Sequence, residues 1–146
     1  MSRTALFAGS FDPYTIGHHS LVERALQMFD KVIIAVGCNS EKGCTMTADE
    51  RVAAIAAHYR GNDRVEVRAY NGLTMDFAHE VGATVLLRGV RNIKDFEYER
   101  ELADINKQLG GIDTVLLVSE PGYSSVSSSV VRELMRYGKD VSELLP

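Results

Sequence analysis

Five short apolar runs, separated by segments with helical periodicity, most constrain the fold of this chain. The run from Lys31 to Gly37 is almost wholly apolar and β-branched, as is typical of a strand covered on both faces of a parallel sheet. The expected strands are Thr4–Ala8, Lys31–Gly37, Val65–Tyr70, Thr84–Arg88 and Thr114–Val118. Their alternation with helices predicts an α/β fold, a five-stranded parallel sheet with right-handed crossovers and helices on both faces.

The segments between the strands carry helix start and stop signals. Thr47 and Glu50 match a capping box, and Thr74 is expected to cap a short helix. We expect Gly89 to stop the fourth strand and Gly110 with Gly111 to end the longest helix. The expected helices are Ser20–Phe29, 47–60, 74–81, Lys94–Leu109 and 129–137. On the longest, four apolar residues stand at helical spacing: Tyr98, Leu102, Ile105 and Leu109.

Length and charge narrow the class of protein. The 146 residues fit one domain, residues 1–146, and the net charge of −4 argues against nucleic acid as a partner. No apolar stretch is long enough to span a membrane, and Met1 leads almost directly into a strand without a signal peptide. Cys38 and Cys44 are too few for a disulfide scaffold or a zinc site. We therefore expect a cytoplasmic protein.

Cations, hydroxyls and glycines follow the strand ends, and few acidic residues accompany them. In parallel α/β sheets, ligands bind beyond the carboxyl ends of the strands. The residues in question are Ser10, His18, Lys42, Gly72, Thr74, Arg88, Arg91, Ser124, Ser125, Ser127, Ser128 and Ser129. Two of these stretches, 9–19 and 127–129, run into helix starts, where free backbone N–H groups and the helix dipole attract anions. A ligand with several phosphates is the simplest common explanation.

Each feature also has an ordinary structural explanation. His18 could be a cap residue, Lys42 a solvated lysine, and the serine run only an N-cap. Arg88 could pair with Glu97 or Glu99 in a structural ion pair. The combination is less easily dismissed, because these features fall on one predicted edge of the sheet.

Missing motifs restrict the chemistry. The chain has no Gly-x-x-x-x-Gly-Lys-Ser/Thr, no Gly-x-Gly-x-x-Gly after the first strand, no Gly-x-Ser-x-Gly elbow and no His-x-x-x-His pair. We find no nucleophile accompanied by a base. A site built from cations and helix starts suits phosphoryl or nucleotidyl transfer by positioning and charge stabilisation.

Several motifs resemble those of known enzymes. The segment 15–18, Thr-Ile-Gly-His, resembles the His/Thr-x-Gly-His motif of the nucleotidyltransferase superfamily, and 126–132 resembles its Ile-Ser-Ser-Thr-x-x-Arg motif. Segments 8–13, 87–91 and 95–99 are similar to those of bacterial phosphopantetheine adenylyltransferases. The resemblance implies a single Rossmann-like nucleotidyltransferase domain that uses Mg²⁺ and assembles as a homohexamer. It also implies the penultimate step of coenzyme A synthesis, in which ATP and 4′-phosphopantetheine give dephospho-coenzyme A and pyrophosphate.

The same resemblance implies roles for individual positions. The catalytic residues would be His18, Ser10, Lys42 and Arg91. Phosphopantetheine would contact Ser10, Lys42, Thr74 and Arg88. ATP would contact Ser10, Phe11, His18, Gly89, Val90, Arg91, Glu99, Tyr123, Ser124, Ser125, Val126, Ser127, Ser128 and Ser129. The Mg²⁺ ion would be bound through the ATP phosphates, and coenzyme A is a plausible feedback inhibitor because it shares the pantetheine arm.

The chain departs from the family pattern in three places. Ser10 and Ser129 stand where threonine is usual, and both keep a hydroxyl group. The chain ends at Pro146, short of a C-terminal helix that many relatives carry. Two alternatives stay open: another small-molecule enzyme, such as a cytidylyltransferase or a nicotinamide-mononucleotide adenylyltransferase, and a nucleotide-binding sensor without turnover.

Overall fold

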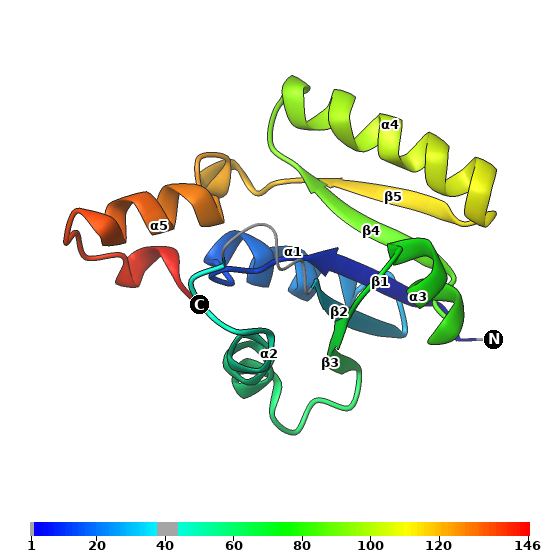
Figure 1. Ribbon diagram of the computed structural model, residues 1–146, viewed down its shortest axis with the longest axis horizontal. Helices are drawn as coiled ribbons and strands as arrows, with labels where there is room; N and C mark the ends of the chain where they lie inside the picture. The colour runs from blue at the N-terminus through cyan, green and yellow to red at the C-terminus, as the bar shows by residue number, and fades with distance from the viewer. Residues whose placement is uncertain (1, 38–43) are drawn as a thin grey trace.

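A computed structural model describes residues 2–37 and 44–146 of the chain. Its centre is a five-stranded sheet in the order β3-β2-β1-β4-β5 (Figure 1). The strands are β1 (Thr4–Gly9), β2 (Lys31–Gly37), β3 (Val65–Tyr70), β4 (Val85–Val90) and β5 (Asp113–Val118). All neighbouring strands pair in parallel, so their carboxyl ends meet at one edge of the sheet. The predicted parallel sheet is confirmed.

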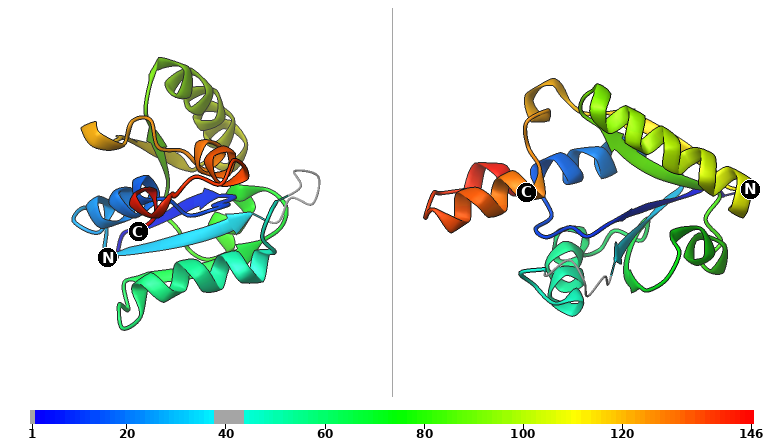
Figure 2. Two further views of the ribbon diagram at one scale, coloured as in Figure 1. Left: turned by 90° about the vertical axis from the view of Figure 1, so that its left-hand side faces the viewer. Right: turned by 45° about the horizontal axis from the view of Figure 1, so that its top comes forward.

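Helices cover both faces of this sheet. They are α1 (Ile16–Ala25), α2 (Ala48–Ala56), α3 (Thr74–Glu80), α4 (Ile93–Gly110) and α5 (Ser128–Arg136). Short 3-10 turns are η2 (Ala57–Tyr59), η3 (Pro121–Tyr123) and η4 (Ser142–Leu144). Side chains of α1 and α2 share one apolar core with β1 and β2, and side chains of α3 share a second core on the other face. Figure 2 shows α2 and α4 on opposite sides of the sheet.

The first helix begins earlier than its apolar periodicity predicts. It runs from Ile16 to Ala25, whereas the sequence pattern predicted Ser20–Phe29. Thr15 is the N-cap, and its side chain and backbone form a reciprocal capping box with His18. The first helical turn therefore carries His18 itself, which the pattern had placed in the preceding turn.

Two predicted boundary signals were wrong, one for the end of a strand and one for the start of a helix. Gly89 does not stop β4, which continues through it to Val90 in register with β5. A side chain at position 89 would place its Cβ 2.6 Å from Leu21 Cδ1, so the leucine would have to shift. Thr74 does not cap α3, because its hydroxyl is instead hydrogen-bonded to the Tyr70 hydroxyl at 2.8 Å.

The apolar spacing on α4 does not mark a buried stripe. Tyr98, Ile105 and Leu109 are all exposed, and Glu99 is the one residue of this helix that is fully buried. Gly111 ends the helix in the left-handed conformation, with a φ of 66°, as the Gly110-Gly111 pair predicted. None of the described helices combines the length and apolar character needed to cross a bilayer.

Candidate active site

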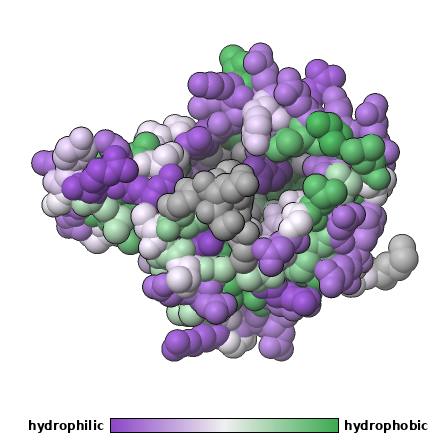
Figure 3. All heavy atoms as spheres, in the orientation of Figure 1, coloured by the Kyte–Doolittle hydropathy of each residue, from purple (hydrophilic) through white to green (hydrophobic). Residues whose placement is uncertain are grey.

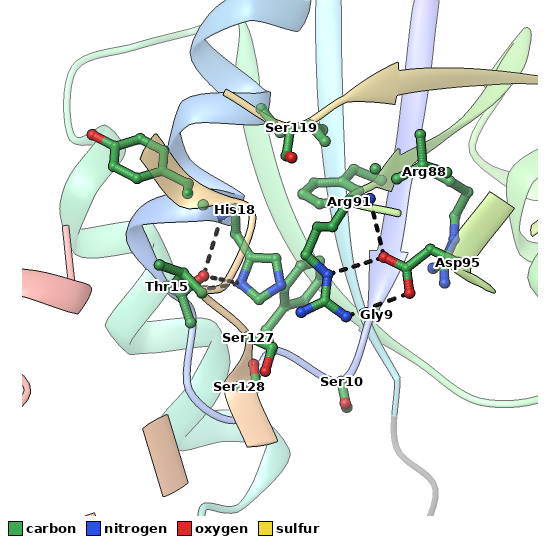
Figure 4. Close-up of a pocket in the computed structure, with 18 of the residues that line it drawn as sticks. Gly9, Ser10, Thr15, His18, Arg88, Arg91, Asp95, Ser119, Ser127 and Ser128 are labelled. Atoms are coloured by element: carbon green, nitrogen blue, oxygen red, sulfur yellow. Dashed lines mark hydrogen bonds and ion pairs between the residues drawn. The ribbon is translucent and has the colours of Figure 1, made fainter. Parts of the chain in front are cut away.

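A pocket of about 380 Å³ lies at the carboxyl ends of β1 and β4. The first turn of α1 and the start of α5 form its walls, together with the segment that follows β5 (Figure 4). These segments are far apart in the sequence and meet because parallel strands share one carboxyl edge. The pocket therefore lies where the strand-end pattern predicted a ligand.

His18 enters the pocket as a neutral hydrogen-bond donor. The backbone N–H of Thr15 donates to its Nδ1 at 2.9 Å, so the ring proton of the neutral imidazole lies on Nε2. Figure 4 shows the ring turned toward Arg91. Burial, followed by the positive charges of Arg88 and Arg91, lowers the pKa of His18 to about 4. At neutral pH the imidazole offers an uncharged N–H to the pocket.

Three arginines that line the pocket are paired with carboxylates that line it too. Arg88 forms a bidentate pair with Glu99, both contacts measuring 2.7 Å. Arg91 bonds Asp95 at 3.0 Å, and Arg24 lies 3.3 Å from Glu120. The expectation of few acidic residues near the site was wrong. The pairs hold the guanidinium groups in fixed orientations and cancel much of their charge.

Arg88 does form the ion pair that was its alternative explanation, and it also lines the pocket. Its partner is Glu99, which is only 6% exposed. Burial alone would raise the pKa of Asp95, but hydrogen bonds from the side chain and backbone of Arg91 and the charge of its guanidinium hold it below its usual range. Asp95 is therefore an ionised partner of Arg91 at neutral pH.

The start of α5 is tied directly to the turn after β1. The Ser127 hydroxyl accepts from the Val130 N–H at 3.2 Å and caps the helix. The Ser128 hydroxyl donates to the Pro13 carbonyl at 2.6 Å, and Arg132 donates to the Asp12 carbonyl at 2.6 Å. The second superfamily motif is thus joined to the turn that precedes the first, and both motifs line the pocket.

The other side of the same turn is held by the segment that enters α2. The buried Asp12 carboxylate accepts from the backbone N–H and the hydroxyl of Thr45, each at 2.8 Å. The buried Arg51 guanidinium donates to the carbonyls of Ser10, Gly37 and Met46 at 2.6, 3.0 and 3.2 Å. These contacts fix the backbone of Ser10 at the junction of β1 and β2.

Most of the predicted site residues come together. The pocket is lined by Ser10, Phe11, His18, Arg88, Gly89, Val90, Arg91, Glu99, Tyr123, Val126, Ser127, Ser128 and Ser129. Thr74, Ser124 and Ser125 are not part of this lining, and Thr74 lies beyond β3 against Tyr70. Lys42 lies outside the described residues.

Sequence reasoning missed other lining residues. Arg132 and Asp95 stand inside the motifs quoted above, and the spacing of Asp95 from Arg91 could have indicated their pair. Arg24 and Glu120 carry no local signal, because they are distant in sequence and meet only in the fold. Arg51 was also missed, since its partners are backbone carbonyls, which no sequence pattern marks.

Comparisons with known proteins agree on one family. The family model described as cytidylyltransferase-like matches residues 6–134. The phosphopantetheine adenylyltransferase of Porphyromonas gingivalis is 52% identical over 142 residues, covering 97% of this chain and 93% of the relative. That of Bacteroides thetaiotaomicron is 49% identical over 144 residues, covering 99% and 95%.

Solved structures show the same fold at low sequence identity. A bifunctional NMN adenylyltransferase/ADP ribose pyrophosphatase from Francisella tularensis has a TM-score of 0.70 and 14% identity, over 99% of this chain and 44% of that chain. A lipopolysaccharide core biosynthesis protein from Thermoplasma volcanium has a TM-score of 0.59 and 20% identity, over 82% of this chain and 98% of that one. Since about half of its residues match the curated relatives across nearly their full length, the chain belongs to the phosphopantetheine adenylyltransferase family.

Proposed function

We propose that this protein transfers the adenylyl group of ATP to 4′-phosphopantetheine, giving dephospho-coenzyme A and pyrophosphate. This is the penultimate step of coenzyme A biosynthesis. The observation that carries the proposal is one pocket in which a neutral histidine, four arginines and two helix starts surround a cavity, in a chain half identical to relatives of that name. These counts refer to the described part of the chain.

The chemistry needs no covalent intermediate. An oxygen of the acceptor phosphate attacks the α-phosphorus of ATP, a new P–O bond forms, and the bond to the departing pyrophosphate breaks. The acceptor phosphate is already ionised near neutral pH, so no general base is required. Among the described lining residues, no serine hydroxyl is hydrogen-bonded to a histidine or carboxylate that could activate it. Catalysis then rests on positioning and on charge stabilisation.

His18 would donate its Nε2–H to phosphate oxygens as negative charge builds up during attack. Ser10 and Arg91 would hold the reacting phosphates, and Lys42 would meet the acceptor phosphate. Arg88, held by Glu99, would face the acceptor with a guanidinium of fixed orientation. Because three of the four lining arginines have carboxylate partners, Arg132 and the two helix starts supply most of the uncompensated positive potential among the described residues.

The donor set does not favour a metal site of the protein's own. Among the described residues, no group of three or more His, Cys, Asp or Glu side chains could hold a metal ion. Mg²⁺ is therefore best treated as part of the MgATP substrate, where it shields the phosphate charge.

A pyrophosphate-release assay tests the proposal. The protein is mixed with Mg²⁺, each nucleoside triphosphate in turn, and each candidate acceptor, including 4′-phosphopantetheine and nicotinamide mononucleotide. Release only with ATP and 4′-phosphopantetheine supports the proposal. Release with CTP or with nicotinamide mononucleotide assigns a different enzyme, and nucleotide binding without release assigns a sensor.

Two variants separate the residue roles. His18→Ala should lower kcat by about 10²–10³, as expected for the loss of one oxyanion donor. An unchanged kcat with a raised KM would make His18 a binding residue only. Lys42→Ala should raise KM for the acceptor more than KM for ATP, and an equal rise for both would refute its assignment.

We propose further that the protein works in the cytoplasm as a homohexamer. In support, α4 exposes apolar side chains beside the exposed Val118 of β5, and Figure 3 shows apolar atoms on the side where α4 lies. The exposed apolar residues of α4 are Ile93, Phe96, Tyr98, Ile105 and Leu109. Native mass spectrometry would give the subunit number, and a charged substitution of Leu109 should lower it.

Feedback by coenzyme A is the last part of the proposal. Coenzyme A carries the same pantetheine arm as the acceptor, so it should compete with 4′-phosphopantetheine for the site. Initial rates at several acceptor concentrations would show a raised KM and an unchanged kcat. An effect on kcat alone would exclude shared occupancy.

A further inference from the structure

Aromatic rings pack closely around the His18 imidazole. The ring of Tyr14 stacks on the imidazole, with the centroids 5.5 Å apart and the planes 20° from parallel. The ring of Phe11 meets the imidazole edge-on at 4.9 Å. Tyr14 and Phe11 are both buried, so water does not separate these rings from the imidazole.

The Tyr14 ring is itself anchored through its hydroxyl. That hydroxyl is hydrogen-bonded to the Tyr59 hydroxyl at 2.5 Å, and the Tyr59 hydroxyl is bonded to His19 Nδ1 at 3.1 Å. His19 Nε2 lies 3.8 Å from Glu23 at the surface. Burial raises the pKa of both tyrosines, that of Tyr59 to about 12, so both hydroxyls keep their protons at neutral pH. The chain of contacts links α1 and the turn before it to η2, the 3-10 turn that follows α2.

Hydrogen bonds to one ring nitrogen alone do not fix the plane of an imidazole. The Thr15 N–H at 2.9 Å and the Thr15 hydroxyl at 3.2 Å both contact Nδ1, and they leave the ring free to tilt about that one atom. The stacked Tyr14 ring removes this freedom, because tilting would drive the two rings into each other. Small errors in donor placement strongly reduce the rate of a reaction that depends on positioning.

We propose that Tyr14, anchored by Tyr59, is a positioning residue that sets the plane of the His18 imidazole and excludes water from its rear face. This inference rests on the proposed function, in which His18 donates to the reacting phosphates. Tyr14 itself touches the imidazole and acts on the reaction only through it.

Three substitutions test the proposal. Tyr14→Leu removes the stacked ring, and Tyr14→Phe keeps the ring and loses the hydroxyl. The matched control is Phe77→Leu, which removes a buried aromatic ring from the other core, far from His18. Tyr14→Leu should lower kcat about tenfold and change KM for ATP less than twofold, whereas Tyr14→Phe should recover most of the rate.

The second readout is the pH at which His18 titrates in the free protein, followed by NMR. The charged groups that face His18 are Arg88 on β4 and Arg91 beyond it, and both remain in every variant. Water that reaches the ring in Tyr14→Leu should move the midpoint upward from about 4, toward the value of an exposed histidine. Tyr14→Phe and Phe77→Leu should leave it unchanged.

If either readout of Tyr14→Leu equals that of Phe77→Leu, Tyr14 only fills the core and the proposal is wrong. If Tyr14→Leu does not fold, Tyr59→Phe decides, because it keeps the packing and removes the anchor. A two- to threefold loss of kcat supports the proposal, and a wild-type rate overturns it. If no acceptor supports turnover, the proposed function fails, and the NMR midpoint alone then decides the role of Tyr14.

Discussion

The charge state of His18 can be tested directly by changing the pH. The ordinary pKa of a histidine side chain is 6.5, and in this protein burial and the neighbouring Arg88 and Arg91 lower the pKa of His18 to about 4. At pH 7 the charged fraction should then be about 0.1%, compared with about a quarter for an exposed histidine. We therefore expect His18 to act as a neutral donor rather than as a cation.

The same shift has a consequence for stability. Between pH 6.5 and about 4, the unfolded chain takes up a proton at this position and the folded protein does not. Lowering the pH through this window therefore favours the unfolded chain by about 1.4 kcal/mol per pH unit from this group, or about 3 kcal/mol in all. The stability is complete above pH 6.5 and falls as the pH falls toward 4.

Two measurements check the prediction. Histidine-ring NMR of the free protein, with His18→Gln used to assign the signal, should give a midpoint near 4 that rises when ATP brings phosphates next to the ring. Urea unfolding at a series of pH values should show a steeper loss of stability for the wild-type protein than for His18→Gln. His58→Gln, at an exposed position, is the matched control and should keep the wild-type pH dependence through His18.

A midpoint near 6.5 in the free protein would refute this reasoning. It would mean that the imidazole is well hydrated and that the two guanidiniums do not act on it. His18 would then carry substantial charge at neutral pH, and its contribution to the reaction would be that of a cation.

Three further substitutions test the packing and the pairs around the site. Glu99→Gln leaves the partly buried Arg88 guanidinium without its carboxylate and should reduce the free energy of unfolding by about 3 kcal/mol. Glu97→Gln, at an exposed position, should change it little. Equal urea midpoints for the two variants would contradict this prediction. Gly89→Ala sets a Cβ against a buried leucine and should cost about 1–3 kcal/mol and weaken ATP binding in calorimetry, whereas Gly122→Ala has open space and should do neither. Thr47→Ala removes the α2 cap and should lower stability by about 1 kcal/mol in thermal unfolding, with Thr47→Ser restoring most of it.

The sheet was predictable because its signals are local. Apolar, β-branched runs mark buried strands whatever their neighbours are. The strand order β3-β2-β1-β4-β5 was not predicted, because such runs do not say which strands pair. The start of α1 was not predictable from apolar periodicity, since its first turn faces the pocket and is held by the Thr15–His18 capping box. On α4 the apolar residues stand at the spacing typical of a buried helix face, yet most of them are exposed. Spacing alone does not say whether a helix face packs against the sheet.

The site also contains residues that the sequence identified and residues that it did not. Residues within the two motifs were identified, and most of them line the pocket. The Arg24–Glu120 pair and the contacts of Arg51 were not, because each joins groups that only the completed fold brings together. Thr74 follows a strand end, as expected, but β3 lies at the edge of the sheet, away from the pocket between β1 and β4.

The contacts between α5 and the turn after β1 have a consequence for the growing polypeptide. Ser128 and Arg132 bond the turn at Pro13 and Asp12 across sequence separations of 115 and 120 residues. A ribosome must therefore release almost the whole chain before this wall of the pocket can close. The strands β1 and β2 emerge first, and α5, which forms the other part of this wall, emerges last. A nascent chain therefore cannot present a finished nucleotide pocket before its translation is nearly complete.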